Sequence, residues 1–167
     1  IAKTTNGGLN WEILTFSWSP YPYFSDIRFY NDQVGVALLN SGAMYKTTNG
    51  GSNWTQLVAN LNNKPVKAAA FVSLDVLIAT TSDGSIYRST TGGTSWSLVQ
   101  QIGQKSLNHI FAKDAFNSWI VGDNGMTIKS SNDGSSWIKT TISITDNPIK
   151  DIIFVDVNQG NAVTGDG

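Results

Sequence analysis

The sequence predicts an all-β fold built from repeated four-stranded antiparallel units. A nine-residue segment ending in tryptophan occurs four times, as KTTNGGLNW, KTTNGGSNW, RSTTGGTSW and KSSNDGSSW, and we call this segment the box. The box tryptophans are Trp11, Trp54, Trp96 and Trp137, at intervals of 43, 42 and 41 residues. No stretch carries apolar residues at helical spacing over three turns. Four short strands in about 42 residues are typical of a β-propeller blade.

One complete repeat shows the expected elements in order. Ser25 to Phe29 is predicted as the first strand, and residues 30–33 form a turn. The continuous apolar run from Val34 to Leu39 predicts a second strand that is covered on both faces. The third strand is expected from Ala43 to Thr47, and the fourth from Trp54 to Val58, after the box.

The other repeats align with this one column by column. The end of the first strand is marked by Phe29, Phe71, Phe111 and Phe154. The second strand is marked by residues 77–79, 119–121 and 162–163, and the turn after it by Gly42, Gly84, Gly125 and Gly167. The predicted repeats are 1–16 (third and fourth strands only), 24–59, 66–101, 107–142 and 149–167 (first and second strands only).

These repeats predict a single propeller, or propeller segment, over residues 1–167, with about four blade-equivalents. We expect it to be part of a larger propeller, because four blades are the lower limit of the range that propellers use. A closed four-bladed ring and a dimer of two such chains with eight blades are the alternatives.

The box itself is expected to be a structural hairpin turn. Asn-Gly between two strands favours a tight turn, because both residue types tolerate positive φ, and the Asn side chain can accept backbone N–H groups. A glycine stands at the second turn position in every copy, and the tryptophan can cover the turn. Gly103, which has no counterpart in the other repeats, is expected to tolerate substitution better. The predicted structural turn residues are Asn6, Gly8, Trp11, Asn49, Gly51, Trp54, Gly93, Trp96, Asn132, Gly134 and Trp137.

The pattern Thr47-x-Asn49-x-Gly51-x-x-Trp54 resembles the Asp-box (BNR) repeat, Ser/Thr-x-Asp-x-Gly-x-x-Trp. That repeat is found in sialidases, sortilin-type receptors, xyloglucanases and the photosystem II assembly and stability factor family. The resemblance implies that each box joins the third and fourth strands of a blade, and that the protein is secreted, periplasmic or on the cell surface. The Asp position holds Asn or, in one copy, Thr91. We expect the Thr91 copy to be the loosest, since threonine reproduces the aspartate side chain poorly.

Composition excludes several classes of function. The chain has 167 residues, a net charge of −1 and no run of Lys or Arg, which argues against nucleic-acid binding. No apolar run reaches membrane-spanning length. The absence of cysteine excludes disulfides and thiolate metal sites, and the single histidine, His109, cannot complete a zinc site without them. His109 is expected on a first strand, packed or facing the central channel. No metal or cofactor is predicted.

Catalytic residues are hard to assemble from this sequence. Sialidases need three arginines and a Tyr–Glu pair, whereas the chain has Arg28 and Arg88 as its only arginines and Glu12 as its only glutamate. Asp83, Asp123 and Asp166 occupy the same turn of successive repeats, where adjacent blades could place two carboxylates at glycosidase spacing. The alternative is that these residues only form turns.

The segment from Phe16 to Phe24 (FSWSPYPYF) is the most unusual stretch, an aromatic connector with two prolines. It is either a platform for a partner or a cover over a blade junction. Connectors and the turns after second strands open on one propeller face, and the boxes lie toward the other. The predicted partner-binding residues are therefore Trp18, Tyr21, Tyr23, Asn40, Asp83 and Asp123. The expected function is a non-catalytic scaffold that binds a protein or glycan on this face. The alternative is a glycoside hydrolase whose catalytic residues lie partly outside these 167 residues.

Overall fold

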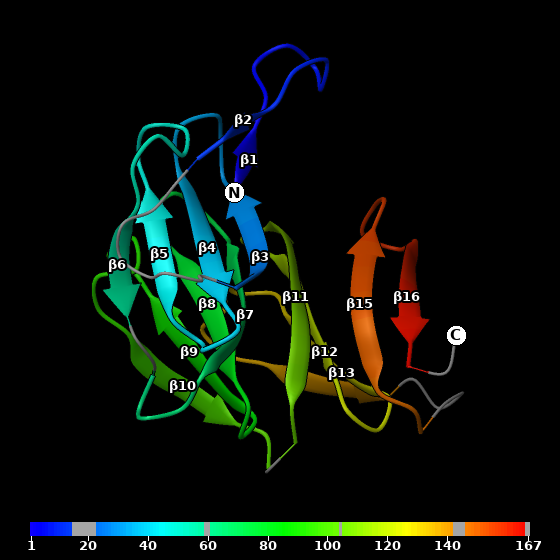
Figure 1. Ribbon diagram of the computed structural model, residues 1–167. Coiled ribbons are helices and arrows are strands. Elements are labelled where there is room, and N and C mark those ends of the chain that lie inside the picture. The colour runs from blue at the N-terminus through cyan, green and yellow to red at the C-terminus, as the bar shows by residue number, and fades with distance from the viewer. Residues whose placement is uncertain (15–22, 59–60, 104, 142–145, 166–167) are drawn as a thin grey trace.

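A computed structural model describes residues 1–14, 23–58, 61–103, 105–141 and 146–165 of the chain (Figure 1). These ranges contain sixteen strands and no helix, which confirms the all-β prediction. Three sheets have four strands each, in the order of the sequence. They are β3 (Phe24–Phe29), β4 (Gly35–Leu39), β5 (Met44–Thr47) and β6 (Thr55–Val58); β7 (Val66–Phe71), β8 (Leu77–Thr81), β9 (Ser85–Ser89) and β10 (Ser97–Gln101); and β11 (Leu107–Asp114), β12 (Asn117–Gly122), β13 (Met126–Ser130) and β14 (Ile138–Thr141).

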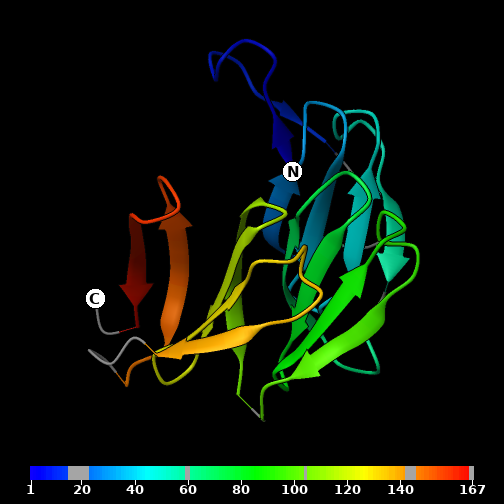
Figure 2. The same cartoon turned by 180° about the vertical axis from the view of Figure 1, so that it is seen from behind.

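Two further sheets have two strands each. β1 (Ala2–Lys3) pairs with β2 (Glu12–Ile13), and these correspond to the third and fourth strands of a blade. β15 (Ile149–Phe154) pairs with β16 (Gly160–Thr164), and these correspond to the first and second strands. In Figures 1 and 2 the three complete blades fan out side by side, and the sheets β1–β2 and β15–β16 do not meet each other. Residues of β15 pack against β12. The described blades therefore form an open arc and not a closed ring.

The core lies between neighbouring blades. Every residue of β4 and β8 is buried, as the continuous apolar runs predict. Ile78, Ile86 and Ile128 are fully buried between the second and third complete blades. The incomplete sheet β1–β2 buries its box less than the complete blades do: Trp11 is 60% exposed, whereas the equivalent Trp54 and Trp137 are 9% and 4% exposed. Packing between blades thus accounts for most of the apolar burial.

Each first strand contains a register shift at the same place. The shift follows Phe24, Val66, Leu107 and Ile149, and the next paired residues are Asp26, Ala68, His109 and Asp151. These four residues are therefore equivalent positions on the inner strands of successive blades.

The register corrects one predicted column. Phe29 pairs with Gly35 and Phe71 with Leu77, but the matching pair in the third complete blade is Ala112 with Ser118. Phe111 is one position early, because it lies two residues after His109, whereas Phe29 and Phe71 lie three residues after Asp26 and Ala68.

The loops form two sets, one at each end of the blades, and backbone hydrogen bonds show which loops lie together. At one end, turns after second strands bond to the connectors, as where Ile102 N–H donates to Gly84 O at 2.8 Å. At the other end, each box bonds to the turn after a first strand, as where Gly50 N–H donates to Gln33 O at 2.8 Å. We call these the connector end and the box end. The predicted separation of the two sets of loops is thus present.

Each box is closed by its own side chains. Thr47 Oγ1 accepts the N–H of Gly51 at 2.8 Å, and Asn49 Oδ1 accepts the N–H of Asn53 at 2.8 Å. Trp54 Nε1–H donates to Gly51 O at 3.0 Å, so the indole covers the turn as predicted. The positive φ values belong to the two glycines, 64° at Gly50 and 85° at Gly51, and not to Asn49.

The copy with Thr91 is not looser, which corrects the sequence prediction. Thr91 Oγ1 accepts the N–H of Ser95 at 2.9 Å, the bond that Asn49 makes in its own box. Ser89 Oγ accepts the N–H of Gly93 at 2.9 Å and Trp96 Nε1–H donates to Gly93 O at 2.8 Å. A hydroxyl oxygen is sufficient here because the turn needs one acceptor at this position. Gly103 also has a positive φ, 64°, so a side chain there is strained, but an added Cβ would have no atom within 4 Å, whereas at Gly51 it would meet Trp54 at 3.6 Å. The better tolerance of Gly103 stays a prediction.

Candidate functional site

The predicted connector-end site is only partly within the described residues. Trp18 and Tyr21 lie outside them. Tyr23 is 69% exposed, and its carbonyl oxygen accepts the N–H of Asn40 at 2.8 Å, so these two residues are adjacent. Asn40 is also exposed, in the turn between β4 and β5.

The two predicted aspartates already accept hydrogen bonds from the protein, Asp83 within its own turn and Asp123 from the start of the neighbouring strand β11. Asp83 Oδ1 accepts hydrogen bonds from the Thr81 hydroxyl at 2.7 Å and the Ser85 N–H at 3.2 Å. The Thr81 bond is the main reason that the pKa of Asp83 is lowered. Asp123 accepts from Ser106 N–H at 3.3 Å and from the side-chain amide of Asn108 at 3.2 Å. The Asp83 carboxylate therefore closes its turn, and the Asp123 carboxylate joins its turn to the start of β11. Their role in binding stays a prediction.

A hollow of about 310 Å³ lies on the inner strands, toward their box end. Its lining residues come from the ends of β3, β7 and β11: Arg28, Phe29, Tyr30, Ala70, Phe71, Val72, Ile110, Phe111, Ala112 and Lys113. The residue of β7 equivalent to Arg28 and Phe111 is Ala70, by the register of the three sheets. Because the Ala70 side chain is short, it leaves space on β7, and the longer side chains on β3 and β11 form the walls of the hollow.

The lining combines apolar surface with positive charge. Phe29 and Tyr30 are each 45% exposed, and Phe111 is partly exposed on the opposite wall. Arg28 and Lys113 are the charged residues of the lining, and no carboxylate belongs to it. Lys113 is exposed and its ammonium donates to Val155 O at 2.9 Å. The hollow suits an apolar group that carries a negative charge.

A chain of polar contacts bounds the hollow on the inner strands. Arg28 Nη2 lies 2.5 Å from His109 Nε2, and His109 Nδ1 lies 2.7 Å from Asp151 Oδ1. Arg28 Nε also donates to Asp26 at 2.9 Å. The neutral imidazole with hydrogen on Nδ1 satisfies both ring contacts, since Nδ1–H donates to the carboxylate and Nε2 accepts from the guanidinium. The contact spans β7, where Ala68 leaves the space open.

Burial is the main reason that the pKa of His109 is lowered from its usual 6.5, and the Arg28 charge lowers this pKa further. Asp151 and Asp26 act in the opposite direction. His109 is buried on a first strand, as predicted. Within the described ranges, no three His, Asp or Glu side chains group together to hold a metal ion. The same ranges contain no helix with the length and apolarity to cross a bilayer.

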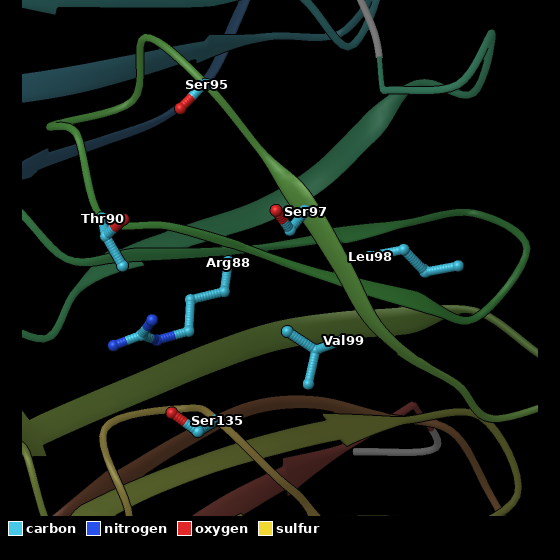
Figure 3. Close-up of a pocket in the computed structure, with 7 residues that line it drawn as sticks. All are labelled: Arg88, Thr90, Ser95, Ser97, Leu98, Val99 and Ser135. Carbon is cyan, nitrogen blue, oxygen red and sulfur yellow. The ribbon is translucent and has the colours of Figure 1, made fainter.

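A second hollow, of about 430 Å³, lies on the outer side of β10 (Figure 3). Hydroxyl groups of Thr90, Ser95, Ser97 and Ser135 and the side chains of Leu98 and Val99 line it together with Arg88. Arg88 is already paired, because its Nε–H donates to Asp133 O at 2.7 Å and its Nη2 to the Asp133 carboxylate. This hollow therefore lies at the junction between two blades, and its one cation is already paired within the protein.

The inner hollow was missed by sequence reasoning. Its local signal is the run of three alanines from Ala68 to Ala70, because the neighbouring inner strands carry large or charged side chains at all three equivalent positions. The polar contacts of His109 could not be predicted from the sequence, because Arg28, His109 and Asp151 are far apart in it.

Comparisons with known proteins agree with the fold. No curated protein matches the chain. An ancestral GH74 enzyme has a TM-score of 0.71 and 24% identity, covering 84% of this chain and 22% of the enzyme. A structure described as YCF48 bound to D1 peptide has a TM-score of 0.64 and 16% identity, covering 81% of this chain and 50% of that one. YCF48 from Cyanidioschyzon merolae has a TM-score of 0.58 and 16% identity, covering 99% of this chain and 74% of that one.

These likenesses show the fold, and the chain spans at most half the length of the first two structures. A sequence model of the family described as photosynthesis system II assembly factor YCF48 matches residues 1–107. The match covers more than half of the 167 residues and includes two complete blades. The chain therefore belongs to the photosynthesis system II assembly factor YCF48 family.

Proposed function

We propose that this chain works as a non-catalytic propeller that binds a protein partner, and that the inner-strand hollow holds an apolar segment of the partner bearing a carboxylate. The observation that carries the proposal is the lining of the hollow, which offers aromatic walls and two cations without a carboxylate of its own. A rigid concave apolar surface with a few fixed polar groups is the usual form of a ligand site.

The family relationship supports a protein as the partner. The related YCF48 structure is described as bound to a D1 peptide, so a propeller of this kind accommodates a peptide. We also propose a secreted, periplasmic or cell-surface location, on the resemblance to Asp-box proteins. The likeness to a GH74 enzyme supports a shared fold, and no described residue of the hollow provides the paired carboxylates of a glycosidase.

The connector end is the second location that we propose for the partner. Tyr23 is a large, exposed aromatic residue beside Asn40, and tyrosine is one of the residue types that most often anchor an interface. The two locations lie at opposite ends of the blades, so substitutions separate them.

Fluorescence anisotropy with a labelled Gly-Ser-Gly-Leu peptide that has a free C-terminal carboxylate tests the proposal. Ala70→Leu fills the floor of the hollow and should weaken binding at least about ten-fold, because the leucine of the peptide loses its space. Lys113→Gln removes an exposed charge and should weaken binding about two- to five-fold, as solvent-screened ion pairs do. Lys139→Gln, at an exposed position on β14, is the matched control and should leave affinity unchanged.

Circular dichroism and melting curves establish that each variant is folded. If Ala70→Leu and Lys113→Gln bind as tightly as the parent chain, the hollow is not the site. A loss of binding in Tyr23→Ala alone would move the site to the connector end.

A further inference from the structure

We propose that His109 is a positioning residue that controls how Arg28 meets the partner. In its neutral form His109 holds the Arg28 guanidinium at the end of the hollow, and in its protonated form it releases Arg28 to the carboxylate of the partner. Binding of a carboxylate-bearing segment should then strengthen as the pH falls. The inference rests on the proposed function of the hollow.

The geometry makes Arg28 dependent on the protonation of His109. The 2.5 Å contact between Arg28 Nη2 and His109 Nε2 requires a lone pair on Nε2, because every nitrogen of a guanidinium is a donor. The Asp151 carboxylate lies 2.7 Å from Nδ1 and also accepts the Ile152 N–H at 2.7 Å, which is shorter than the 3.4 Å between that N–H and Nδ1. Nδ1 is therefore occupied. A second proton on His109 must therefore enter at Nε2, facing Arg28.

Protonation would replace an attractive contact with a repulsive one. Two positive groups at this distance repel each other, more strongly in a buried setting than in water. Arg28 keeps its Asp26 partner through Nε, so the guanidinium can turn without losing its anchor. The hollow is lined by Arg28 and offers space over Ala70, which gives Nη2 a place to turn toward.

The remaining charges around His109 do not substitute for Arg28. Among the strands that pack against β11, β8 and β12 carry no charged side chain, and β7 carries only Lys67, which is exposed. β15 carries Lys150 and Asp151, which are both exposed, and β3 carries Asp26 and Arg28. Asp151 remains paired with the imidazole in either state, so the contact that changes is the one with Arg28.

The coupling must act in both directions. If protonated His109 favours the carboxylate ligand, the ligand favours protonated His109 by the same factor. The ligand should therefore raise the pKa of His109, which burial and Arg28 lower in the free protein. A histidine whose protonation is not coupled to the bound carboxylate would show no such change.

The test follows the single histidine of the chain by NMR, since its ring resonances need no assignment. The full chain is titrated from pH 8 to 5 free, with the Gly-Ser-Gly-Leu carboxylate peptide, and with its C-terminal amide as the matched control. A C-terminal carboxylate stays ionised over this range, at about pKa 3.5. We expect the carboxylate peptide, but not the amide, to raise the pKa of His109.

Anisotropy titrations at pH 7.5 and 5.5 supply the second measurement. The affinity of the parent chain for the carboxylate peptide should rise several-fold at pH 5.5, with an upper limit of about ten-fold per pH unit for one coupled proton. His109→Gln keeps an acceptor for Arg28 but cannot be protonated in this range, so its affinity should be the same at both pH values. The NMR result on the parent chain measures the coupling of His109 to the carboxylate even if His109→Gln does not fold.

Two contrary results have different meanings. Tight binding with an unchanged His109 titration and equal affinity at both pH values would overturn this inference and leave the proposed function standing. Failure of the parent chain to bind the carboxylate peptide at either pH would overturn both.

Discussion

We expect Thr47→Val to destabilise the protein by about 2 kcal/mol, because it removes the acceptor at the centre of a buried box. Thr47 is 1% exposed, and its hydroxyl accepts the N–H groups of Gly51 at 2.8 Å and Asn49 at 3.3 Å. Valine keeps a similar shape and the β-branched side chain of a strand residue. The change therefore leaves the buried Gly51 N–H without a partner, which costs about 1–3 kcal/mol.

The matched control is Thr4→Val, at the equivalent position before Gly8. Thr4 Oγ1 accepts the Gly8 N–H at 2.9 Å, so the local bond is the same. This box is open to solvent, as the 60% exposure of Trp11 shows, and water can replace the lost acceptor. The cost should stay below about 1 kcal/mol.

Urea denaturation and thermal melting compare the two variants with the parent chain. For a domain of this size about 2 kcal/mol corresponds to roughly 4–8 °C in melting temperature. Equal shifts for Thr47→Val and Thr4→Val, or a negligible shift for both, would show that the hydroxyl bond does not stabilise the buried boxes in the way described.

Three further variants test other parts of the structure. Gly51→Ala should cost about 1–2 kcal/mol, because φ is 85° there, whereas Gly165→Ala, at a glycine without positive φ, should be close to neutral in the same melting assay. Arg88→Met should lower the free energy of unfolding by about 1–3 kcal/mol, because it removes charged hydrogen bonds to the next box. The control Lys139→Met should change the free energy of unfolding little, and similar denaturation midpoints for the two variants would contradict this. The pKa of His109 is lowered in the folded state, so between that pKa and 6.5 the folded state binds fewer protons than the unfolded state. The contribution of His109 to the free energy of unfolding should therefore be fully present above pH 6.5 and decrease below it. His109→Gln should remove that part of the pH dependence, which urea titrations at pH 7.5 and 5.5 measure.

The fold could be predicted from the sequence because its determinants are local and repeated. The box needs a hydroxyl at Thr47, glycine at Gly51 and an indole at Trp54, and all lie within nine residues. What the box does not need is a carboxylate or amide at the Asp position, as Thr91 demonstrates. Sequence reasoning gave that position too much weight, because it judged the residue by its likeness to aspartate and not by the single acceptor required.

The register of one strand and the inner hollow could not be predicted in the same way. Phe111 lies one position before its counterparts, because it follows His109 by two residues and not three, and a column of phenylalanines in the sequence conceals this offset. The hollow depends on the contrast between Ala70 on one strand and Arg28 on another, which appears only when the sheets are placed side by side. The aromatic connector attracted attention because its composition is unusual, whereas a recess is made by small residues that do not stand out.

The contacts between successive boxes have a consequence for how such a chain grows. Lys46 donates to Gly92 O at 2.7 Å and Arg88 donates to Asp133 O at 2.7 Å, so the cation that ends one third strand reaches the box of the following blade. The repeat of β7 to β10 therefore carries both halves of the junction, with Gly92 O as the acceptor for its predecessor and Arg88 as the donor to its successor. Duplication of one repeat in a gene would insert a blade whose junctions on both sides are already complementary. Propellers with different numbers of blades can in this way arise by copying alone, before any selection on the new interface.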